Sequence, residues 1–182
     1  MRITTLGAAA LSAVLTFAVA GPASAASIAM TDPHDTSRGS DLRAVKLTNG
    51  DRNVVVTTTH TNLRRDPMSG SGGAVYIDTD RTDKGPEFVF VGGYFVGTDY
   101  QLLHTEGFGH RNWGAPVGGF YEMTVDYARE HVRMRMSRKS LGNPGKVRIA
   151  VRVSGTRSDG TSNGLVDWLG EPRSFTPWVA KG

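Results

Sequence analysis

The second half of the chain alternates apolar and polar residues with a period of two, and this pattern constrains the fold more than any other feature. The alternation runs through 121–127 and 132–137 and returns in 147–153. Successive side chains of a β-strand point to opposite sides of the sheet, so each run predicts a strand with one buried face. The first two runs predict a hairpin that pairs Tyr127 with Val132, Val125 with Met134 and Asp126 with Arg133.

Runs of β-branched residues, separated by turn residues, predict the other strands. Residues 42–48 and 52–60 are expected to form a hairpin joined by Asn49-Gly50, a dipeptide suited to tight turns. Further strands are expected at 74–79, 87–96, 99–106 and within 165–179, with loops at 63–73, 80–86 and 107–119. The expected fold is therefore all-β, an antiparallel β-sandwich of jelly-roll or immunoglobulin-like topology, with a closed barrel as the alternative.

The first 25 residues predict a cleavable secretory signal peptide. Arg2 precedes an apolar stretch from Leu6 to Ala20, and Ala23-Ser24-Ala25 supplies the small residues of a cleavage site. The apolar stretch is short for a membrane anchor, so a secreted protein without a membrane span after cleavage is expected. Residues 26–40 are polar and lack a period, which predicts a partly disordered segment before a single sandwich domain at 41–182.

Several features in a fixed order carry a family resemblance. An Asp-rich segment is followed by the hairpin at 41–60, the tract Val75-Tyr76-Ile77-Asp78-Thr79-Asp80, a turn ending in Leu141-Gly142 before a strand, and a loop at Asp159. In this order the chain resembles the DOMON-like sandwiches that include family-9 carbohydrate-binding modules, although it lacks the proline commonly found just before the Leu-Gly turn. The resemblance implies the sandwich fold; members bind sugars or haem, or have no known ligand, so no single ligand is implied.

An acidic tract predicts a calcium site. Asp78, Asp80, Asp83 and Glu87 place four carboxylates within ten positions, where a strand leads into a loop. Calcium takes six to eight oxygen ligands, and alternate acids leaving a strand can supply several of them. Thr82 stands where a calcium loop would have Asp or Asn, so a solvated acidic turn is the alternative.

The glycine-rich loop at 107–119 predicts a ligand site built on an aromatic side chain. Trp113 stands there beside Arg111 and Asn112, and Tyr94 and Tyr100 are expected to join it from neighbouring strands. The flat face of a pyranose stacks on such rings, and loops on a rigid sandwich commonly carry function. The alternative is that Trp113 packs in the core, as Trp168 and Trp178 are expected to do at the end of the sandwich.

Two other groups of polar residues suggest binding chemistry. His104, Glu106 and His110 are the residue types that bind zinc or copper, although their spacing matches no established motif, and exposed polar residues are the alternative. The basic stretch predicts a surface patch made of Arg133 and Arg135 on one strand face and Lys146, Arg148 and Arg152 on an adjacent one. Such a patch suits an anionic polymer, whereas an ordinary solvated sheet face is the alternative.

The sequence carries no catalytic motif. It has no cysteine, which excludes thiol catalysis and zinc–thiolate sites, and no Gly-x-Ser-x-Gly nucleophile elbow. The expected function is that of a secreted, non-catalytic binding module for carbohydrate, with a polysaccharide or cell-envelope polymer as partner and calcium as the only expected ion. Nucleic acid is not an expected partner. Two alternatives stay open: an envelope-associated structural protein that binds an anionic polymer through its basic face, and an extracellular hydrolase.

Overall fold

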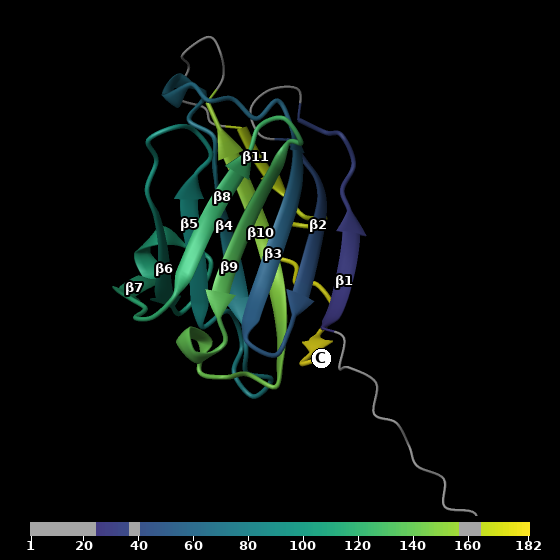
Figure 1. Ribbon diagram of the computed structural model, residues 1–182, viewed down its shortest axis with the longest axis vertical. Helices are drawn as coiled ribbons and strands as arrows, with labels where there is room; N and C mark the ends of the chain where they lie inside the picture. The colour runs from purple at the N-terminus through teal and green to yellow at the C-terminus, as the bar shows by residue number, and fades with distance from the viewer. Residues whose placement is uncertain (1–24, 37–40, 157–164) are drawn as a thin grey trace, which may run out of the picture.

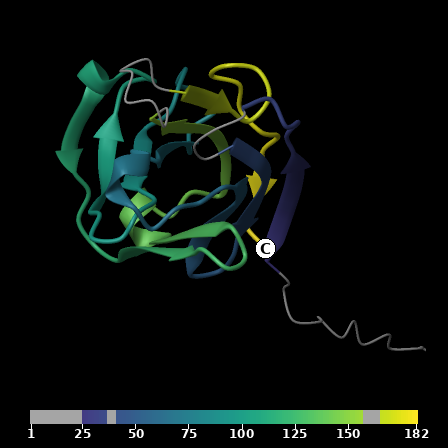
Figure 2. The same ribbon diagram turned by 90° about the horizontal axis from the view of Figure 1, so that it is seen from above.

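Two antiparallel sheets pack face to face, which confirms the predicted β-sandwich (Figure 1). The computed structural model describes residues 25–36, 41–156 and 165–182. The predicted signal peptide lies outside the described residues, apart from Ala25. Seen from above, the strands curve around a common interior (Figure 2).

Sheet A forms the front layer in Figure 1 and has the strand order β1-β2-β3-β9-β8. The bounds of its strands are β1 Ala26–Thr31, β2 Asp41–Asn49, β3 Asn53–Thr61, β8 Tyr121–Asp126 and β9 His131–Ser137. The β2–β3 and β8–β9 hairpins are the two that the sequence predicts.

Sheet B forms the second layer, with the order β11-β10-β4-β5-β6-β7 and β12 pairing with β10. Its strands are β4 Gly72–Asp78, β5 Phe88–Gly93, β6 Tyr100–Thr105, β7 Trp113–Pro116, β10 Lys146–Gly155, β11 Leu165–Trp168 and β12 Val179–Ala180. Short 3₁₀ turns, η1 Pro67–Ser69, η2 His110–Asn112 and η3 Lys139–Leu141, lie in the connections.

The main core lies between the sheets and is filled by the alternating residues of both. Val132, Met134 and Met136 of β9 are fully buried there, as are Val147 and Ile149 of β10. Burying one such side chain stabilises the fold by about 1.5–3 kcal/mol. The period-two pattern therefore predicted correctly which residues of these strands face inward.

The β8–β9 hairpin keeps the predicted inner face but differs from the predicted pairing. Val125 pairs with Val132 and Asp126 with His131, a register two positions from the one expected. The Asp126 carboxylate accepts hydrogen bonds from the backbone N–H groups of Ala128 and Arg129, at 3.0 and 3.1 Å. These bonds start the turn at Asp126, which removes Tyr127 from the ladder. A shift of two leaves every side chain on its original face.

Residues 26–31 form a strand, which corrects the prediction that the segment 26–40 is unstructured at its start. β1 pairs with β2 along its length, and Ile28 and Met30 pack against the main core. The predicted loop at 107–119 likewise contains a strand, because β7 pairs with β6 at Thr105 and Trp113.

The C-terminal segment connects the two sheets at one end of the sandwich. Val179 of β12 pairs with Val147 of β10, and its carbonyl oxygen accepts a 3.0 Å hydrogen bond from the side-chain amide of Asn49. The Asn49 amide oxygen accepts from the buried guanidinium of Arg138. The N–H of Gly182 also bonds to the Asn49 carbonyl oxygen, at 3.0 Å. The end of the chain is thus fixed to β2.

Candidate functional site

The outer face of sheet B carries a second apolar layer, separate from the main core. Four central strands contribute buried residues to it: Ala74, Tyr76, Val89, Leu103 and Ala150. Ala150, Tyr76, Val89 and Leu103 are register partners on consecutive strands, so they form one row across the sheet. Small and apolar residues on both sides of a strand indicate that further groups cover its outer face.

Aromatic rings from three other segments cover this row. Phe108 packs 4.9 Å from the Tyr76 ring, and Trp168 of β11 stacks on Tyr76 at 6.1 Å with an interplanar angle of 15°. Phe175, from the segment after β11, packs 5.4 Å from Phe108. We call the six rings on this side the aromatic face: Tyr76, Phe108, Trp113, Trp168, Phe175 and Trp178.

A hydrogen bond fixes the loop before η2 to the aromatic face. The Tyr76 hydroxyl donates to the Phe108 carbonyl oxygen at 2.7 Å. Burial raises the pKa of Tyr76, against smaller lowering effects of Arg152 and of the Trp113 indole N–H. The hydroxyl therefore stays protonated at neutral pH and keeps its donor role.

Trp113 lies at the β7 edge of the aromatic face and is half-buried in the same cluster. The ring of His110 packs over it with 4.1 Å between centroids and a tilt of 32°. Arg111 and Asn112 of η2 are exposed beside it. The structure thus brings together three of the five residues that the sequence predicts for ligand binding.

Tyr94 and Tyr100 lie on the other side of sheet B, so the prediction that they join Trp113 is wrong. Tyr94 is fully buried in the main core, with its hydroxyl against Gly73. The Tyr100 ring stacks on the buried Phe90, at 5.8 Å and 13°, and meets Tyr121 of sheet A edge-on. The strand pleat explains the error, because these residues share the inward-facing side.

Cations lie among the rings at the β10 side of the aromatic face. The Arg148 guanidinium carbon lies 4.5 Å from the centre of the Phe175 ring and 4.7 Å from that of Trp178. Lys146 and Arg81 approach the same Trp178 ring at 5.9 and 5.4 Å. Trp168 and Trp178 therefore lie on the outer surface, and the prediction that they close the end of the core is wrong.

The acids of the predicted calcium tract have separate partners. Asp78 is fully buried, and its Oδ2 accepts hydrogen bonds from Arg148 Nε at 2.7 Å and Nη2 at 2.6 Å. Glu87 accepts from the N–H and hydroxyl of Thr79, at 2.6 and 2.9 Å. Burial raises the pKa of both carboxyls, against the lowering effect of these partners.

The other two acids of the tract bond within the exposed turn. Asp80 accepts from the N–H and hydroxyl of Thr82, both at 2.8 Å, and Asp83 accepts from the N–H of Lys84 at 2.7 Å. In the described part of the chain the tract does not form a group of three converging carboxylates. A calcium ion in this tract stays a prediction.

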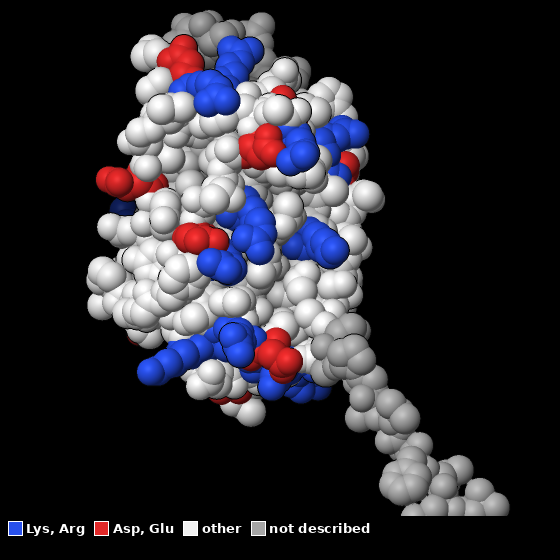
Figure 3. Space-filling view, viewed as in Figure 1, with Lys and Arg blue, Asp and Glu red and all other residues white. Residues whose placement is uncertain are grey.

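The predicted basic patch is divided between the two outer faces of the sandwich, which corrects the expectation that its two halves are adjacent. Arg133 and Arg135 are on β9 of sheet A, where both approach Glu122, at 3.7 and 2.8 Å. Lys146, Arg148 and Arg152 are on β10 of sheet B. Figure 3 shows the sheet A side, where acidic groups lie among the basic ones. The sheet A half of the predicted patch is therefore paired with an acid rather than being a basic surface of one sign.

The three residues proposed for zinc or copper do not form a metal-binding group in the described residues. His104 packs against Phe88 at 5.2 Å, whereas His110 packs on Trp113. Glu106 is exposed beyond the end of β6. Each histidine ring is thus used in an aromatic contact.

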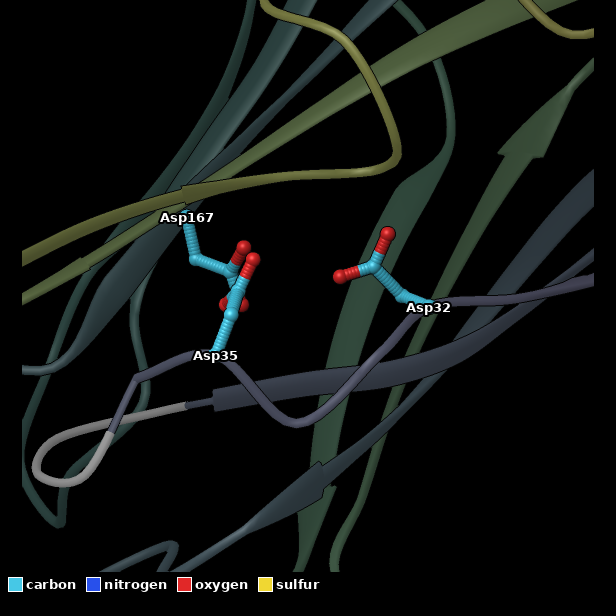
Figure 4. A group of neighbouring side chains, drawn as sticks. All are labelled: Asp32, Asp35 and Asp167. Carbon is cyan, nitrogen blue, oxygen red and sulfur yellow. The ribbon is translucent and has the colours of Figure 1, made fainter.

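A group of acids that the sequence analysis did not single out lies where the two sheets meet. Asp32 follows β1, Asp35 precedes β2, and Asp167 is on β11. Each contributes one carboxylate oxygen to a set that all lie within 4.8 Å of one another (Figure 4). Asp32 and Asp167 are buried and Asp35 is exposed. Among the described residues this is the one group of His, Asp and Glu side chains arranged in this way.

The chain matches no protein-family model, no curated protein and no solved structure in the three comparisons made. The resemblance to the DOMON-like sandwiches therefore stays a prediction. Within the described residues, no helix is long and apolar enough to cross a membrane. What is established is the architecture, an all-β sandwich with an aromatic outer face and a carboxylate group at the junction of its sheets.

Proposed function

We propose that this protein is a secreted, non-catalytic module that binds an anionic polysaccharide through the outer face of sheet B. The observation that carries the proposal is the mixture of aromatic rings and cations on that face. Trp113, Trp168 and Trp178 are all half-buried, so each ring keeps part of its surface available. Aromatic rings stack against the apolar faces of sugar rings, and cations select carboxylate or sulfate substituents.

The charges on this face favour an acidic ligand over a neutral one. Arg148 is paired with Asp78, but Lys146 and Arg152 make no ion pair with any described carboxylate. Both project from the same side of β10 as Arg148, because they occupy alternate positions of one strand. An ordered Arg148 between two rings would also help to keep Phe175 and Trp178 in place for stacking.

The predicted signal peptide supports an extracellular location, where polysaccharides are available. The absence of cysteine from the chain means that the sandwich needs no oxidative step to fold after export. Asp167 of the acid group directly precedes Trp168 on β11, but Asp167 is buried whereas Trp168 packs on Tyr76 of the aromatic face, so neighbouring residues of one strand serve the two features separately.

Binding to purified polysaccharides tests the proposal. The protein should be retarded by polygalacturonate in affinity electrophoresis, and less so by neutral cellulose derivatives. Trp113→Ala and Lys146→Gln should each weaken binding by about tenfold, which corresponds to roughly 1.4 kcal/mol. Salt should weaken binding to the acidic polymer, since the cations are near the surface.

Arg129→Gln is the matched control, because it removes an exposed cation from the β8–β9 turn of sheet A. It should bind like the wild type. The proposal fails if the wild type binds none of the acidic polysaccharides, or if Arg129→Gln weakens binding as much as Lys146→Gln.

A further inference from the structure

We propose that Asp32, Asp35 and Asp167 bind a calcium ion that joins sheet A to sheet B. The site is separate from the proposed polysaccharide face and from the acidic tract at 78–87. Two of its carboxylates, Asp32 and Asp35, come from the connection between β1 and β2, and the third, Asp167, comes from β11, far along the chain (Figure 4).

The distances between the oxygens fit calcium. Calcium–oxygen bonds are about 2.3–2.6 Å long, so two ligand oxygens on one ion are at most about 5 Å apart. The three carboxylate oxygens lie within 4.8 Å of one another. A single ion at their centre would therefore contact all three. Magnesium demands near-ideal octahedral geometry and gives up its waters reluctantly, so a group of protein carboxylates favours calcium over magnesium.

A buried carboxylate with one unpartnered oxygen faces the group. Asp32 is only 5% exposed, and its Oδ1 accepts a 2.7 Å hydrogen bond from the N–H of Gly170. Its Oδ2 is buried and makes no hydrogen bond. Figure 4 shows one oxygen of Asp32 directed at Asp35 and Asp167. Leaving a buried carboxylate oxygen unsatisfied is costly, and a cation in the group would satisfy it.

The neighbouring charges leave the group with an excess of negative charge. Asp41 is a fourth acid close by, but His34, Thr36 and Thr61 already donate to its carboxylate. The nearby cation is Arg43, whose Nη1 lies 3.6 Å from Asp41 Oδ2. Among the described residues, Arg43 forms an ion pair with Asp41, the acid outside the group, and with none of the three acids in it.

The pKa values agree with a site that lacks a positive charge. Burial first, and then the charges of Asp35, Asp32 and Asp41, together raise the pKa of Asp167 to about 6, against the lowering effect of the Leu42 N–H. Burial and the same kind of repulsion raise the pKa of Asp32, against the lowering effects of the Gly170 N–H and Arg43. A divalent cation would reverse this effect by stabilising the ionised carboxylates.

The position of the group explains what the ion would do. Asp167 on β11 accepts a 2.7 Å hydrogen bond from the N–H of Leu42 on β2, and Asp32 binds Gly170 just after β11. These two bonds already join the open edges of the sheets. The ion would add a third link between the two sheets. It would also hold the exposed Asp35 side chain against Asp32 and Asp167.

Thermal unfolding with Ca²⁺ alone as the probe tests the inference. The purified protein, freed of metal with a chelator, should gain about 5–10 °C in Tm at a hundredfold excess of Ca²⁺ over its dissociation constant. Mg²⁺ at the same concentration should give a smaller increase. Calorimetric titration should show one ion bound per chain.

Two variants locate the ion. Asp35→Asn changes an exposed side chain and should abolish the Ca²⁺-dependent rise in Tm without preventing folding. Asp32→Asn should abolish it too, but should raise the Tm of the metal-free protein, because its amide can donate to the two remaining carboxylates. Asp32→Asn should thus lose the Ca²⁺ response while the Tm of the metal-free protein rises. Replacing a residue with only a structural role would lower that Tm instead.

Asp80→Asn is the matched control, since it makes the same change in the acidic tract at 78–87 and at an exposed position. It should leave the Ca²⁺ response intact. The inference is overturned if Ca²⁺ does not change the Tm of the wild type, if Asp35→Asn responds like the wild type, or if Asp80→Asn alone removes the response.

Discussion

Asn49 connects the end of β2 to two distant parts of the chain. The Asn49-Gly50 dipeptide predicted a hairpin through the positive φ angles that it tolerates, yet neither residue has a positive φ. Asn49 is the last residue of β2, fully buried, and its amide joins Arg138 to the carbonyl of Val179. A local turn propensity and a long-range contact thus coincide at one residue.

Gly73 is the residue where the absence of a side chain matters most for packing. A Cβ there would lie 1.9 Å from the Tyr94 hydroxyl oxygen and 2.7 Å from Tyr94 Cζ. Both residues are enclosed by sheet B and the main core, so the ring cannot move aside freely. Gly73→Ala should therefore destabilise the protein by roughly 2–3 kcal/mol through overpacking, measured by denaturant unfolding.

The companion variant Tyr94→Phe makes this prediction specific. It removes the oxygen nearest to the added Cβ, so Gly73→Ala/Tyr94→Phe should regain part of the stability lost in Gly73→Ala. A double variant whose loss equals the sum of the two single losses would show that the hydroxyl is not the cause.

At the scale of elements, the sequence predicted the strands whose alternation of buried and solvated residues is long and strongly apolar on one face. β8, β9 and β10 follow the period-two pattern, and their inner faces agree with the structure. β1 was missed because its alternation of Ala26, Ile28 and Met30 with smaller residues is short and lies beside a polar segment. The pattern was present but weak.

The candidate sites were harder to predict, because they depend on which elements become neighbours. Asp167 binds the N–H of Leu42, 125 positions away in the chain, and no local pattern indicates that contact. The aromatic face had a readable signal in Tyr76 and Val89, apolar residues on the outward side of their strands. The basic patch was divided because β9 and β10 belong to different sheets. Which sheet a strand joins depends on the topology, and composition does not indicate it.

The loop at 106–112 is an element held to sheet B by a few identifiable contacts. The Tyr76 hydroxyl binds the Phe108 carbonyl, and the Thr105 hydroxyl contacts the carbonyls of Gly107 and Asn112, at 2.7 and 3.1 Å. Tyr76→Phe keeps the ring contacts and removes one hydrogen bond. It should cost about 1 kcal/mol and accelerate amide hydrogen exchange in 106–112.

Thr58→Ala provides a comparison for this prediction, because it removes a buried hydroxyl from β3 on the other sheet. It should reduce stability without a selective effect on exchange in 106–112. Equal acceleration of exchange throughout the chain in Tyr76→Phe would show that the bond does not hold the loop in particular.

On the scale of the whole molecule, the start and the end of the sandwich meet at one strand end. Ala26 pairs with Asn49, and the N–H of Gly182 bonds to the carbonyl of the same Asn49. Lys181 also pairs with Asp51, at 3.1 Å, on the turn that follows. The first strand and the last residue are therefore adjacent in space.

This adjacency predicts that the order of the strands in the chain can be changed without changing the fold. A circular permutant that joins Gly182 to Ala26 through a short Gly/Ser linker, with new ends between Thr82 and Asp83, should fold to the same sandwich. Residues 81–84 are exposed, and this cut breaks no hydrogen bond described within the turn. Its circular dichroism spectrum should match that of the wild type, and its Tm should lie within a few degrees.

A permutant with the new ends inside β4, between Tyr76 and Ile77, is the contrasting case. It interrupts the ladders to β5 and β10 and should not fold. Failure of the first permutant together with success of the second would show that chain order, rather than the contacts of the folded state, determines the structure.

The meeting of both ends beside Asn49 also bears on how such a domain can be combined with others. A domain with adjacent ends can be inserted into a surface turn of a host protein without forcing the host chain apart. The aromatic face belongs to sheet B, where the ladders to β4 and β11 hold Arg148 and Arg152, and the pairing with β12 holds Lys146. The sandwich is therefore suited to insertion into a host protein, with linkers at Ala26 and Gly182 and with the aromatic face left exposed.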